Sequence, residues 1–345
     1  MEVQKRKILY PVSPHLRDYL HRYGRAAQLP LTYPQLMECH ESMPVYDKQG
    51  NDTLWETFVY EPVRWAEIER ALAQTYAHLK APGNLSIADQ LRADRVDFCT
   101  FGNTRPFRIR IVNKYNDNHD YMYIKRTDAS RIYGLELEEL LSPNSINFLV
   151  HENTLIEEHI VGVPGDQFIV DYFQRDDLNK VRIAKEFVKF NERCFLRLLG
   201  DMRSYNYVVR MTPDFDDRQY RVRAIDFDQQ SYEGRHRFYL PQFFKDNKPV
   251  VELCLSHLNP ESVQQYRNEE QALIARRASM APYRLNALKA AMCRDAIAPA
   301  EKVAQLATEL ADYNRHTPFS RCQSMGEIVF AHIEFFLAKA NGGKT

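Results

Sequence analysis

The sequence predicts an α+β protein in which a small antiparallel sheet is followed by a mainly helical region. Three observations lead to this fold class. Residues 96–126 contain short segments of strand-like pattern separated by turn residues. From residue 176 onward most apolar residues recur at helical spacing, interrupted by one hairpin-like segment. The third observation is size, because 345 residues with 44% hydrophobic content suffice for one large domain or two packed lobes.

The composition argues against several classes of protein. The 46 basic and 46 acidic residues give a formal net charge of zero, so no nucleic-acid partner is expected. The N-terminus resembles no signal peptide, and no stretch reaches the roughly 18 apolar residues of a membrane span, so no membrane partner is expected either. The six cysteines are scattered without a C-x-x-C pair, which predicts reduced core residues of a cytoplasmic protein.

Residues 1–90 are predicted to form a mainly helical N-terminal extension. Within it, residues 63–79 place apolar side chains at helical spacing, and the run Pro82-Gly83-Asn84 ends the pattern. The sequence leaves the role of this extension open, and a regulatory cap and a substrate-docking element are both hypotheses.

Three strands are predicted over residues 96–101, 107–112 and 121–126. The second of these alternates with period two, so one face of the strand is apolar and the other carries cationic side chains. Short polar connections join the three segments in order. An antiparallel meander is therefore the simplest topology.

A short helix near residues 130–141 and two strands, 146–150 and 155–160, are predicted next. A long helix follows, capped by Asp176 or Asp177, with a buried apolar stripe that extends to Leu198. Residues 207–211 and 220–228 are predicted to form a hairpin whose second strand ends in carboxylates. The remainder is expected to be mostly helical, and its last helix begins with a capping box from Ser324 to Glu327.

The residues best suited to chemistry lie around the end of the long helix. Asp201, Arg203 and Asn206 fall within six residues directly after it, and Asp226 and Asp228 end the hairpin that follows. A strand-ending Asp close to a loop Asn provides the hard oxygen ligands that Mg²⁺ prefers. A second Asp near that ion could orient a hydroxyl nucleophile, and an Arg could neutralise a phosphoryl group in transfer.

These residues also carry a resemblance to a known family. The segment Gly200-Asp201-x-Arg203-x-x-Asn206 resembles the catalytic loop of the protein-kinase-like superfamily, and Ile225-Asp226-Phe227-Asp228 resembles its metal-binding Asp-Phe-Gly. Upstream, Tyr123-Ile124-Lys125 is similar to the lysine motif of the third strand. Residues 155–165 are similar to the hinge of small-molecule kinases. The resemblance covers roughly residues 90–240 and is nearer to aminoglycoside and other small-molecule kinases than to typical eukaryotic protein kinases.

The resemblance implies a bilobal kinase-like fold and a role for each matching residue. The small antiparallel-sheet N-lobe and the hinge would occupy residues 91–160, and the mainly helical C-lobe residues 161–345. Asp201 would orient or deprotonate the acceptor hydroxyl, with Arg203 beside it. The remaining implied roles concern ATP and Mg²⁺: Lys125 for the phosphates, a helix glutamate (Glu139, or else Glu136 or Glu138) for Lys125, the backbone of Glu158, His159 and Ile160 for adenine, and Asn206, Asp226 and Asp228 for the metal.

The sequence departs from the family pattern at three places. Leu199 stands where the family has a histidine before Gly-Asp, so the hydrogen bond of that histidine is missing or replaced. The loop expected to cover the phosphates, residues 101–106, has one glycine, and its backbone cannot approach phosphates as a glycine-rich loop does. Arg105 or Arg108 could compensate. Asp228 replaces the glycine that is the third residue of the Asp-Phe-Gly motif.

Three functions are consistent with these residues. The first is an ATP- and Mg²⁺-dependent phosphotransferase that acts on a hydroxyl of a small molecule or a protein. The second is a pseudokinase that binds nucleotide or serves as a scaffold without turnover. The third is a kinase-like AMP transferase, which would use the same residues with the nucleotide reversed. The acceptor and the oligomeric state are not predictable from the sequence.

Overall fold

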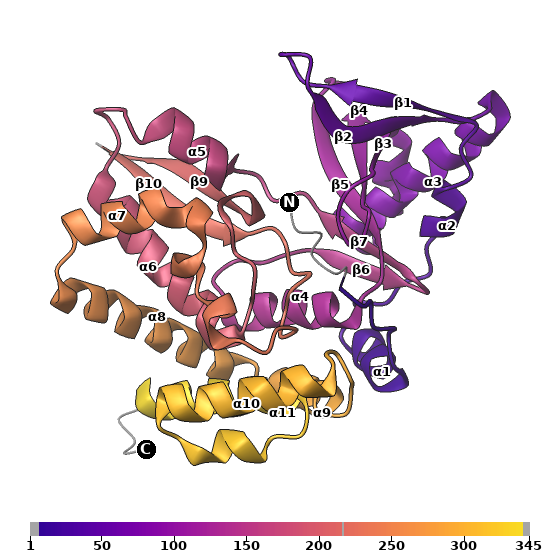
Figure 1. Ribbon diagram of the computed structural model, residues 1–345. Helices are drawn as coiled ribbons and strands as arrows, with labels where there is room; N and C mark the ends of the chain where they lie inside the picture. The colour runs from indigo at the N-terminus through magenta and orange to yellow at the C-terminus, as the bar shows by residue number, and fades with distance from the viewer. Residues whose placement is uncertain (1–6, 216, 341–345) are drawn as a thin grey trace. The chain divides into compact units, whose positions relative to one another are not determined.

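A computed structural model describes residues 7–215 and 217–340 of the chain (Figure 1). The chain divides into two compact units. The first, here named the sheet unit, consists of Met1–Ala129 and Ile146–His159, and the second, named the helical unit, of Ser130–Ser145 and Ile160–Thr345. The second crossing between them falls after His159, within the segment predicted as a hinge.

The sheet unit is built on seven antiparallel strands. The order across the sheet is β1-β2-β3-β4-β5-β7-β6, so the predicted meander forms its centre as β3, β4 and β5. The strands are β1 (Glu41–Tyr46), β2 (Asp52–Val59), β3 (Leu91–Cys99), β4 (Phe107–Asn113), β5 (His119–Arg126), β6 (Phe148–His151) and β7 (Thr154–Glu158).

The alternation in β4 separates the two faces of this sheet. Phe107, Ile109 and Ile111 are buried together with apolar residues of helix α3 (Pro62–Lys80), which covers that face. Arg108 and Arg110 point to the opposite face, as the period-two pattern predicts. One face of the sheet is therefore an apolar core and the other is polar.

The N-terminal residues differ from the helical extension that was predicted. They form α1 (Pro14–Arg22), α2 (Tyr33–Leu36), α3 and the 3₁₀ helix η1 (Leu85–Gln90), but also strands β1 and β2, and they belong to the sheet unit. The hairpin was missed because β1 is an exposed edge strand that contains Pro44 and buries no side chain. Its sequence therefore has no apolar alternation.

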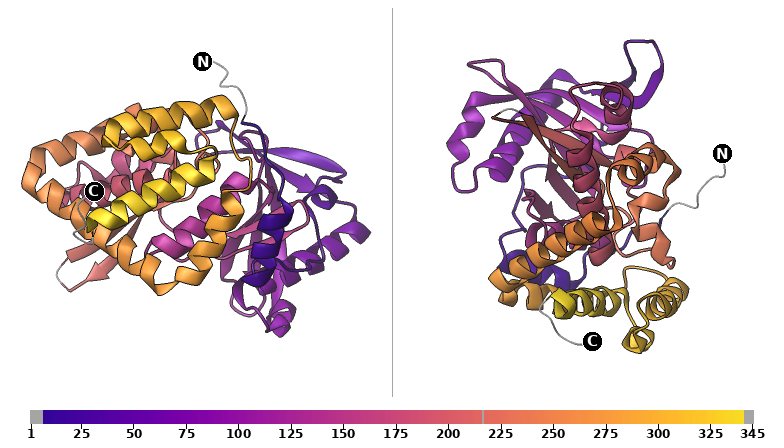
Figure 2. Two further views of the ribbon diagram at one scale, coloured as in Figure 1. Left: turned by 90° about the horizontal axis from the view of Figure 1, so that it is seen from below. Right: turned by 90° about the vertical axis from the view of Figure 1, so that its left-hand side faces the viewer.

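The helical unit contains most of the remaining elements. Its long helix α6 contacts α7, α8 and α11, and α11 also contacts α9 and α10, a packing that can be followed in Figure 2. The α-helices are α4 (Ala129–Leu141), α5 (Gly165–Tyr172), α6 (Lys180–Arg197), α7 (Lys248–His257), α8 (Pro260–Met280), α9 (Pro282–Met292), α10 (Ala300–Asn314) and α11 (Met325–Ala340).

Short elements complete this unit. A small sheet has the order β10-β9-β8, and the predicted hairpin is its β9–β10 pair. The elements are β8 (Val163–Pro164), β9 (Tyr207–Asp214) and β10 (Asp217–Ala224), with the 3₁₀ helices η2 (Ser204–Asn206), η3 (His236–Tyr239), η4 (Pro241–Phe243), η5 (Lys245–Asn247) and η6 (Thr317–Arg321).

Helix α6 delivers the chain to the Gly-Asp segment. Its N-cap is Asn179, whose side chain accepts a hydrogen bond from the Arg182 amide, and not Asp176 or Asp177 as predicted. The two aspartates precede the cap because the chain first makes a turn closed by the amide of Leu178 on the carbonyl of Arg175. The helix ends at Leu198, a fully buried residue in the left-handed conformation, with φ of 53°.

The α+β fold class is confirmed: an antiparallel sheet unit and a mainly helical unit, consistent with the predicted kinase-like fold. Of the helices described, none combines the length and apolar composition needed to cross a bilayer. All six cysteines are free thiols, and Cys194 is buried while the other five are half-buried.

Candidate functional site

The loop after α6 is held in a defined conformation by its own backbone. Asp201 has φ of 57°, and its carbonyl accepts hydrogen bonds from the Arg203 amide (2.8 Å) and from Nδ2 of Asn206 (2.7 Å). The Asp201 amide donates to the carbonyl of Phe238 (3.3 Å). Gly200 is required at this point, because a Cβ there would lie 2.7 Å from the Phe238 ring. Asp201 and Asn206 are thus brought together as the sequence predicted.

Arg203 joins this loop to the segment between η4 and α7. Its Nε donates to Oδ1 of Asp201 (2.9 Å), and its Nη1 donates to Oδ2 of Asp246 (3.2 Å). The guanidinium also lies over the ring of Phe244, at 5.3 Å from the ring centroid. Arg203 is therefore directed at the carboxylate of Asp201, where it balances negative charge.

The carboxyl group of Asp201 has an unusual acidity. Burial raises its pKa to about 6, against the opposing effect of the Arg203 guanidinium, and the negative charge of nearby Asp226 raises it further. A carboxylate with a pKa close to neutral pH is a better proton acceptor than an ordinary aspartate. The environment of Asp201 is consistent with a general base.

The two aspartates that end the hairpin are clamped by a buried arginine. Nη1 of Arg131, on the first turn of α4, donates to Oδ1 of Asp226 (2.7 Å) and to Oδ1 of Asp228 (2.6 Å). The Asp228 amide also donates to Oδ1 of Asp226 (2.9 Å). The side chain of Arg131 is only 1% exposed, so these carboxylates stabilise its positive charge where water cannot.

The loop and the hairpin end are bonded to each other directly. The amide of Ile225 donates to the Asn206 carbonyl (3.0 Å), and the amide of Gly200 donates to the carbonyl of Gln229 (3.2 Å). The amide of Ser231 donates to the Leu198 carbonyl (2.8 Å). These bonds keep the Asp201 loop and the Asp226 segment in one rigid arrangement.

Gln230 attaches the end of the hairpin segment to the last residues before the Asp201 loop. Its fully buried side chain donates through Nε2 to the carbonyls of Arg197 (2.6 Å) and Leu198 (3.2 Å), directly before the Asp201 loop. Leu199 itself is fully buried, forms a bridge with Gln230 and donates its amide to the Cys194 carbonyl (2.9 Å). Leu199 is thus an apolar anchor before the Asp201 loop, and Gln230 supplies the polar contact.

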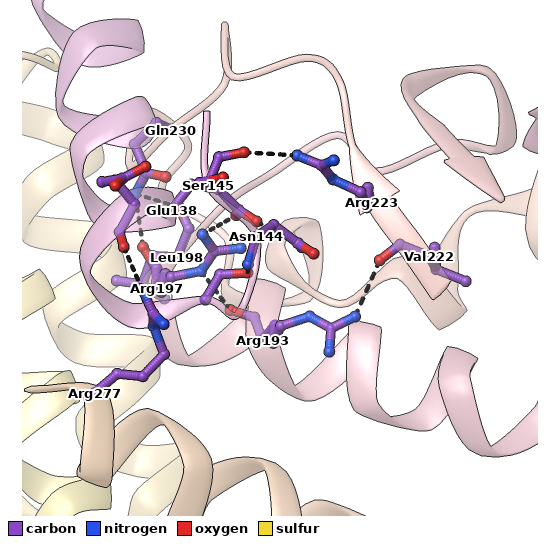
Figure 3. A network of polar contacts seen from close by, with 12 residues as sticks. Glu138, Asn144, Ser145, Arg193, Arg197, Leu198, Val222, Arg223, Gln230 and Arg277 are labelled. Atoms are coloured by element: carbon purple, nitrogen blue, oxygen red, sulfur yellow. Dashed lines mark hydrogen bonds and ion pairs between the residues drawn. The ribbon is translucent and has the colours of Figure 1, made fainter. Parts of the chain in front are cut away.

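The three candidate glutamates of α4 all have partners within the helical unit. Glu136 accepts from Arg284 of α9, and Glu138 forms a buried ion pair with Arg197 and accepts from Nδ2 of Asn144 (3.0 Å). The Arg197 guanidinium lowers the pKa of Glu138, against the effect of its burial. Figure 3 shows Glu138 with Asn144 and Arg197. Arg277 also donates to the Glu139 carbonyl (2.7 Å). The network fixes α4 to α6, α8 and α9.

Lys125 has a partner other than the predicted helix glutamate. Its Nζ lies 2.8 Å from Oε2 of Glu157 on the adjacent strand β7, and 5.5 Å from the ring centroid of Tyr123. Both partners belong to the sheet unit, whereas Glu139 belongs to the helical unit. Within the sheet unit Lys125 is therefore paired with Glu157, and its pairing with an α4 glutamate stays a prediction.

The residues predicted to contact adenine lie at the end of β7. The amide of Glu158 donates to the Asn147 carbonyl (3.0 Å), and the amide of His159 donates to the Tyr121 carbonyl (3.3 Å). The carboxylate of Glu158 binds Lys80 at 3.0 Å. Ile160, buried, is the first residue of the helical unit after this strand.

The oxygen donors around Asp226 fit a hard cation such as Mg²⁺. Asn206 uses Nδ2 for the Asp201 carbonyl, which leaves Oδ1 as its ligand atom. The side chain of Asp226 is 35% exposed and that of Asp228 is 11% exposed, so Asp226 is the more accessible ligand. Within the described residues no group of three His, Cys, Asp or Glu side chains could hold a metal ion. Such a cation would therefore need phosphate oxygens and water as further ligands.

Four residues of this arrangement were not predicted from the sequence. Each lies at least 32 residues from its partner in the chain, so no local motif marks them. The period-two alternation of β7 places Glu157 and Leu155 on one face beside β5. This alternation was the one feature of the sequence that could have indicated the contact of Glu157 with Lys125. The four residues are Arg131, Glu157, Gln230 and Asp246.

Comparison with known proteins adds little to this geometry. No protein-family model and no curated protein matches the chain. Among solved structures it is similar to one described as titin kinase and its flanking domains, with 10% sequence identity and a TM-score of 0.29. The match covers 75% of this chain and 59% of that chain. A TM-score of this size carries no argument, so the kinase-like interpretation depends on the motifs and contacts described above.

Proposed function

We propose that this protein is a cytoplasmic ATP- and Mg²⁺-dependent phosphotransferase that transfers the γ-phosphoryl group to a hydroxyl of a small molecule or a protein. The observation that carries the proposal is the environment of Asp201. Burial and the negative charge of Asp226 raise the pKa of its carboxyl group to about 6. Its backbone carbonyl accepts a hydrogen bond from Asn206. A proton acceptor and oxygen ligands for a hard cation are thus held in one loop assembly.

Each residue has a role in the proposed reaction. Asp201 accepts the proton of the acceptor hydroxyl as that oxygen bonds to the γ-phosphorus and the bond to the bridging oxygen breaks, releasing ADP. Asn206 and Asp226 hold Mg²⁺, which neutralises phosphate charge when bound. Lys125 and Arg203 add positive charge, on the nucleotide phosphates and beside Asp201 respectively. Lys125 acts with Glu157 as its partner.

The experiment uses ATP labelled at either the γ or the α phosphate. Wild-type protein and Asp226→Ala are incubated with Mg²⁺, each form of ATP, and a panel of small hydroxyl compounds and generic protein acceptors. We expect γ label on an acceptor with wild type and none with the variant. Transfer of α label would instead identify a nucleotidyl transferase. The absence of any ATP-dependent change in the melting temperature of the wild-type protein would refute the proposal.

A pseudokinase is the second candidate, and the Arg131 clamp favours it. A buried guanidinium already neutralises part of the charge of Asp226 and Asp228, as a metal ion would do. A module of this kind would bind ATP without transferring either label. Labelling of Lys125 by an acyl-phosphate derivative of ATP, with protection by unmodified ATP, would show that nucleotide binds near this lysine in both cases.

A further inference from the structure

The polar face of the sheet unit carries a cationic cluster beside Lys125. In the register of β4 and β5, Arg108 lies opposite Tyr123, so both side chains project from the same face. Lys125 lies two residues farther along β5 and projects from that face as well. Diagonal neighbours of this kind are separated by about 7–8 Å between Cα atoms, within reach of long side chains. Arg108 and Lys125 can therefore contact one ligand that carries two or more phosphates.

Arg108 is fixed in place by a buried carboxylate. Its Nη2 and Nε donate to Oδ2 of Asp97 (2.8 and 3.2 Å), and the hydroxyl of Thr57 donates to Oδ1 of the same residue (2.8 Å). Arg95 Nε lies 3.0 Å from that Oδ1. One carboxylate is thus shared by two guanidinium groups, so this cluster retains an excess positive charge that can attract an anion.

Trp55, on strand β2 of the N-terminal hairpin, packs against the flat face of the Arg108 guanidinium. The Cζ atom of Arg108 lies 4.5 Å from the centroid of the Trp55 ring and 5.8 Å from that of Tyr121. Contacts of this kind hold a planar guanidinium in one orientation and leave its edge available. With 27% of its side chain exposed, Arg108 is accessible to solvent, whereas Asp97 is not.

The connection from β3 to the loop before β4 begins with two amides that are already bonded to carbonyl groups. The amide of Cys99 donates to the Pro106 carbonyl (2.9 Å), and the amide of Thr100 donates to the Leu54 carbonyl (3.0 Å). Gly102 is the loop's single glycine. Lys125 is paired with Glu157, so part of its charge is already balanced. A polyphosphate at this face needs a further cation, and Arg108 is the one that the fold orients.

We propose that Arg108, oriented by Asp97 and Trp55, forms with Lys125 a subsite for the phosphates of the bound nucleotide. This subsite takes the place of a glycine-rich loop, and residues 52–59 of the N-terminal region complete it. The inference depends on the proposed function, because it assigns part of the nucleotide site. It gives β2 a role that the sequence left open.

The test compares ligands that differ only in their phosphates. Binding of ATP, ADP and adenosine is measured by calorimetry in the presence of Mg²⁺ for wild type, Arg108→Met and Arg110→Met. Arg110 is the matched control, because it lies on the same strand and face but about two residues farther from Lys125. We expect Arg108→Met to weaken ATP and ADP binding about ten- to a hundredfold and to leave adenosine binding unchanged. Arg110→Met is expected to resemble wild type.

The outcomes separate this inference from the function on which it depends. If wild type binds ATP more tightly than adenosine and Arg108→Met preserves that preference, the subsite is refuted while the phosphotransferase proposal stands. If wild type binds none of the three ligands, both fail. If Arg108→Met does not fold, Arg108→Lys serves instead. This variant retains a positive charge beside Asp97 but lacks the planar guanidinium with its several hydrogen-bond donors. Weaker ATP binding with unchanged adenosine binding supports the subsite, and unchanged ATP binding overturns it.

Discussion

A buried charged side chain shared by two partners of opposite sign occurs in the sheet unit and in the helical unit, and the two clusters compared are inverted in charge. In the sheet unit, the carboxylate of Asp97 is shared by two guanidinium groups. In the helical unit, the guanidinium of Arg131 is shared by two carboxylates. The central side chain is 1% exposed in both. The flanking residues are Arg95 and Arg108 in the first cluster and Asp226 and Asp228 in the second.

The difference in sign indicates which ligand each cluster attracts. A buried group shared by two partners orients both of them. The two guanidinium groups of the Asp97 cluster are suited to an anion, and the carboxylates of the Arg131 cluster are of the type that binds a hard cation. A magnesium–nucleotide complex contains both kinds of charge. The comparison predicts that changes in the two clusters affect different ligands, which can be tested separately.

The largest effect is expected from the acidic cluster. Asp226→Ala removes the most accessible predicted metal ligand, and phosphoryl transfer should fall about a thousandfold. Label transfer from γ-labelled ATP measures it. Asp214→Ala is the control, because Asp214 is an exposed residue of the β9–β10 turn, and it should keep full activity. Equal activity in the two variants would contradict the assignment. The sequence also predicts that Asp216 belongs to this solvated turn, and that residue lies outside the described residues.

Removal of the shared guanidinium should cause the largest loss of stability. Arg131→Met leaves two carboxylates without their buried partner, and we expect the free energy of unfolding to fall by about 3–5 kcal/mol. Urea unfolding measures the change. Adding Asp228→Asn to this variant should restore part of the loss, because one of the two charges is then absent. Arg210→Met, on an exposed position of β9, is the control and should change stability by less than about 0.5 kcal/mol.

The raised pKa of Asp201 predicts a stability that depends on pH. Below about pH 4 the carboxyl group is protonated in both the folded and the unfolded states, and it has no effect. As the pH rises toward 6, Asp201 ionises in the unfolded chain but stays largely protonated in the folded chain. The free energy of unfolding of wild type should therefore fall by roughly 2–3 kcal/mol. Asp201→Asn should keep that stability at pH 8 but lose activity. Unfolding at pH 5 and pH 8 measures both proteins.

The same pKa predicts the pH profile of the reaction. Because the unprotonated form of Asp201 is the base, the rate of wild type should rise about tenfold per pH unit below pH 6 and then level off. Asp246→Asn is a useful companion, since it removes the other carboxylate on Arg203 but leaves the base. A flat profile between pH 5 and 7 would show that Asp201 does not limit the reaction.

The smallest effect is expected in the Asp97 cluster. Asp97→Asn leaves Arg95 and Arg108 facing each other, but both are partly solvated, so the loss of stability should be about 1–3 kcal/mol. Asp94→Asn, at a more exposed carboxylate that binds Arg92 and Arg110, should cost about 0–1 kcal/mol. Thermal unfolding of the two variants makes the comparison. Equal losses would mean that burial of Asp97 has no energetic consequence.

Local patterns in the sequence were sufficient for most of the elements around the site. The period-two alternation of residues 107–112 predicted β4 and its cationic face, and the helical spacing after residue 180 predicted α6. The hairpin of β1 and β2 was missed because β1 is an exposed edge strand with no alternating burial that a sequence could record. The cap of α6 was misplaced because a turn, invisible in composition, lies between the aspartates and Asn179.

The motif residues were predicted better than their partners. The spacing of Asp201, Asn206 and Asp226 marked a loop and a strand end, and these residues do come together in the helical unit. The partners of Glu136 and Asp226 could not be predicted, because Arg284 and Arg131 lie 148 and 95 residues away. Contacts at such separations depend on tertiary packing, which no local pattern encodes.

The left-handed residues around the Asp201 loop make its shape depend on the rest of the helical unit. Leu198, Asp201 and Ser231 all have positive φ, which disfavours each by on the order of 1 kcal/mol relative to ordinary backbone. A segment with two such residues three positions apart does not adopt this shape alone. The shape is retained only once the amides and the carbonyl of residues 225–231 reach it across the hairpin. We therefore expect that an isolated peptide of the loop sequence would not reproduce this shape.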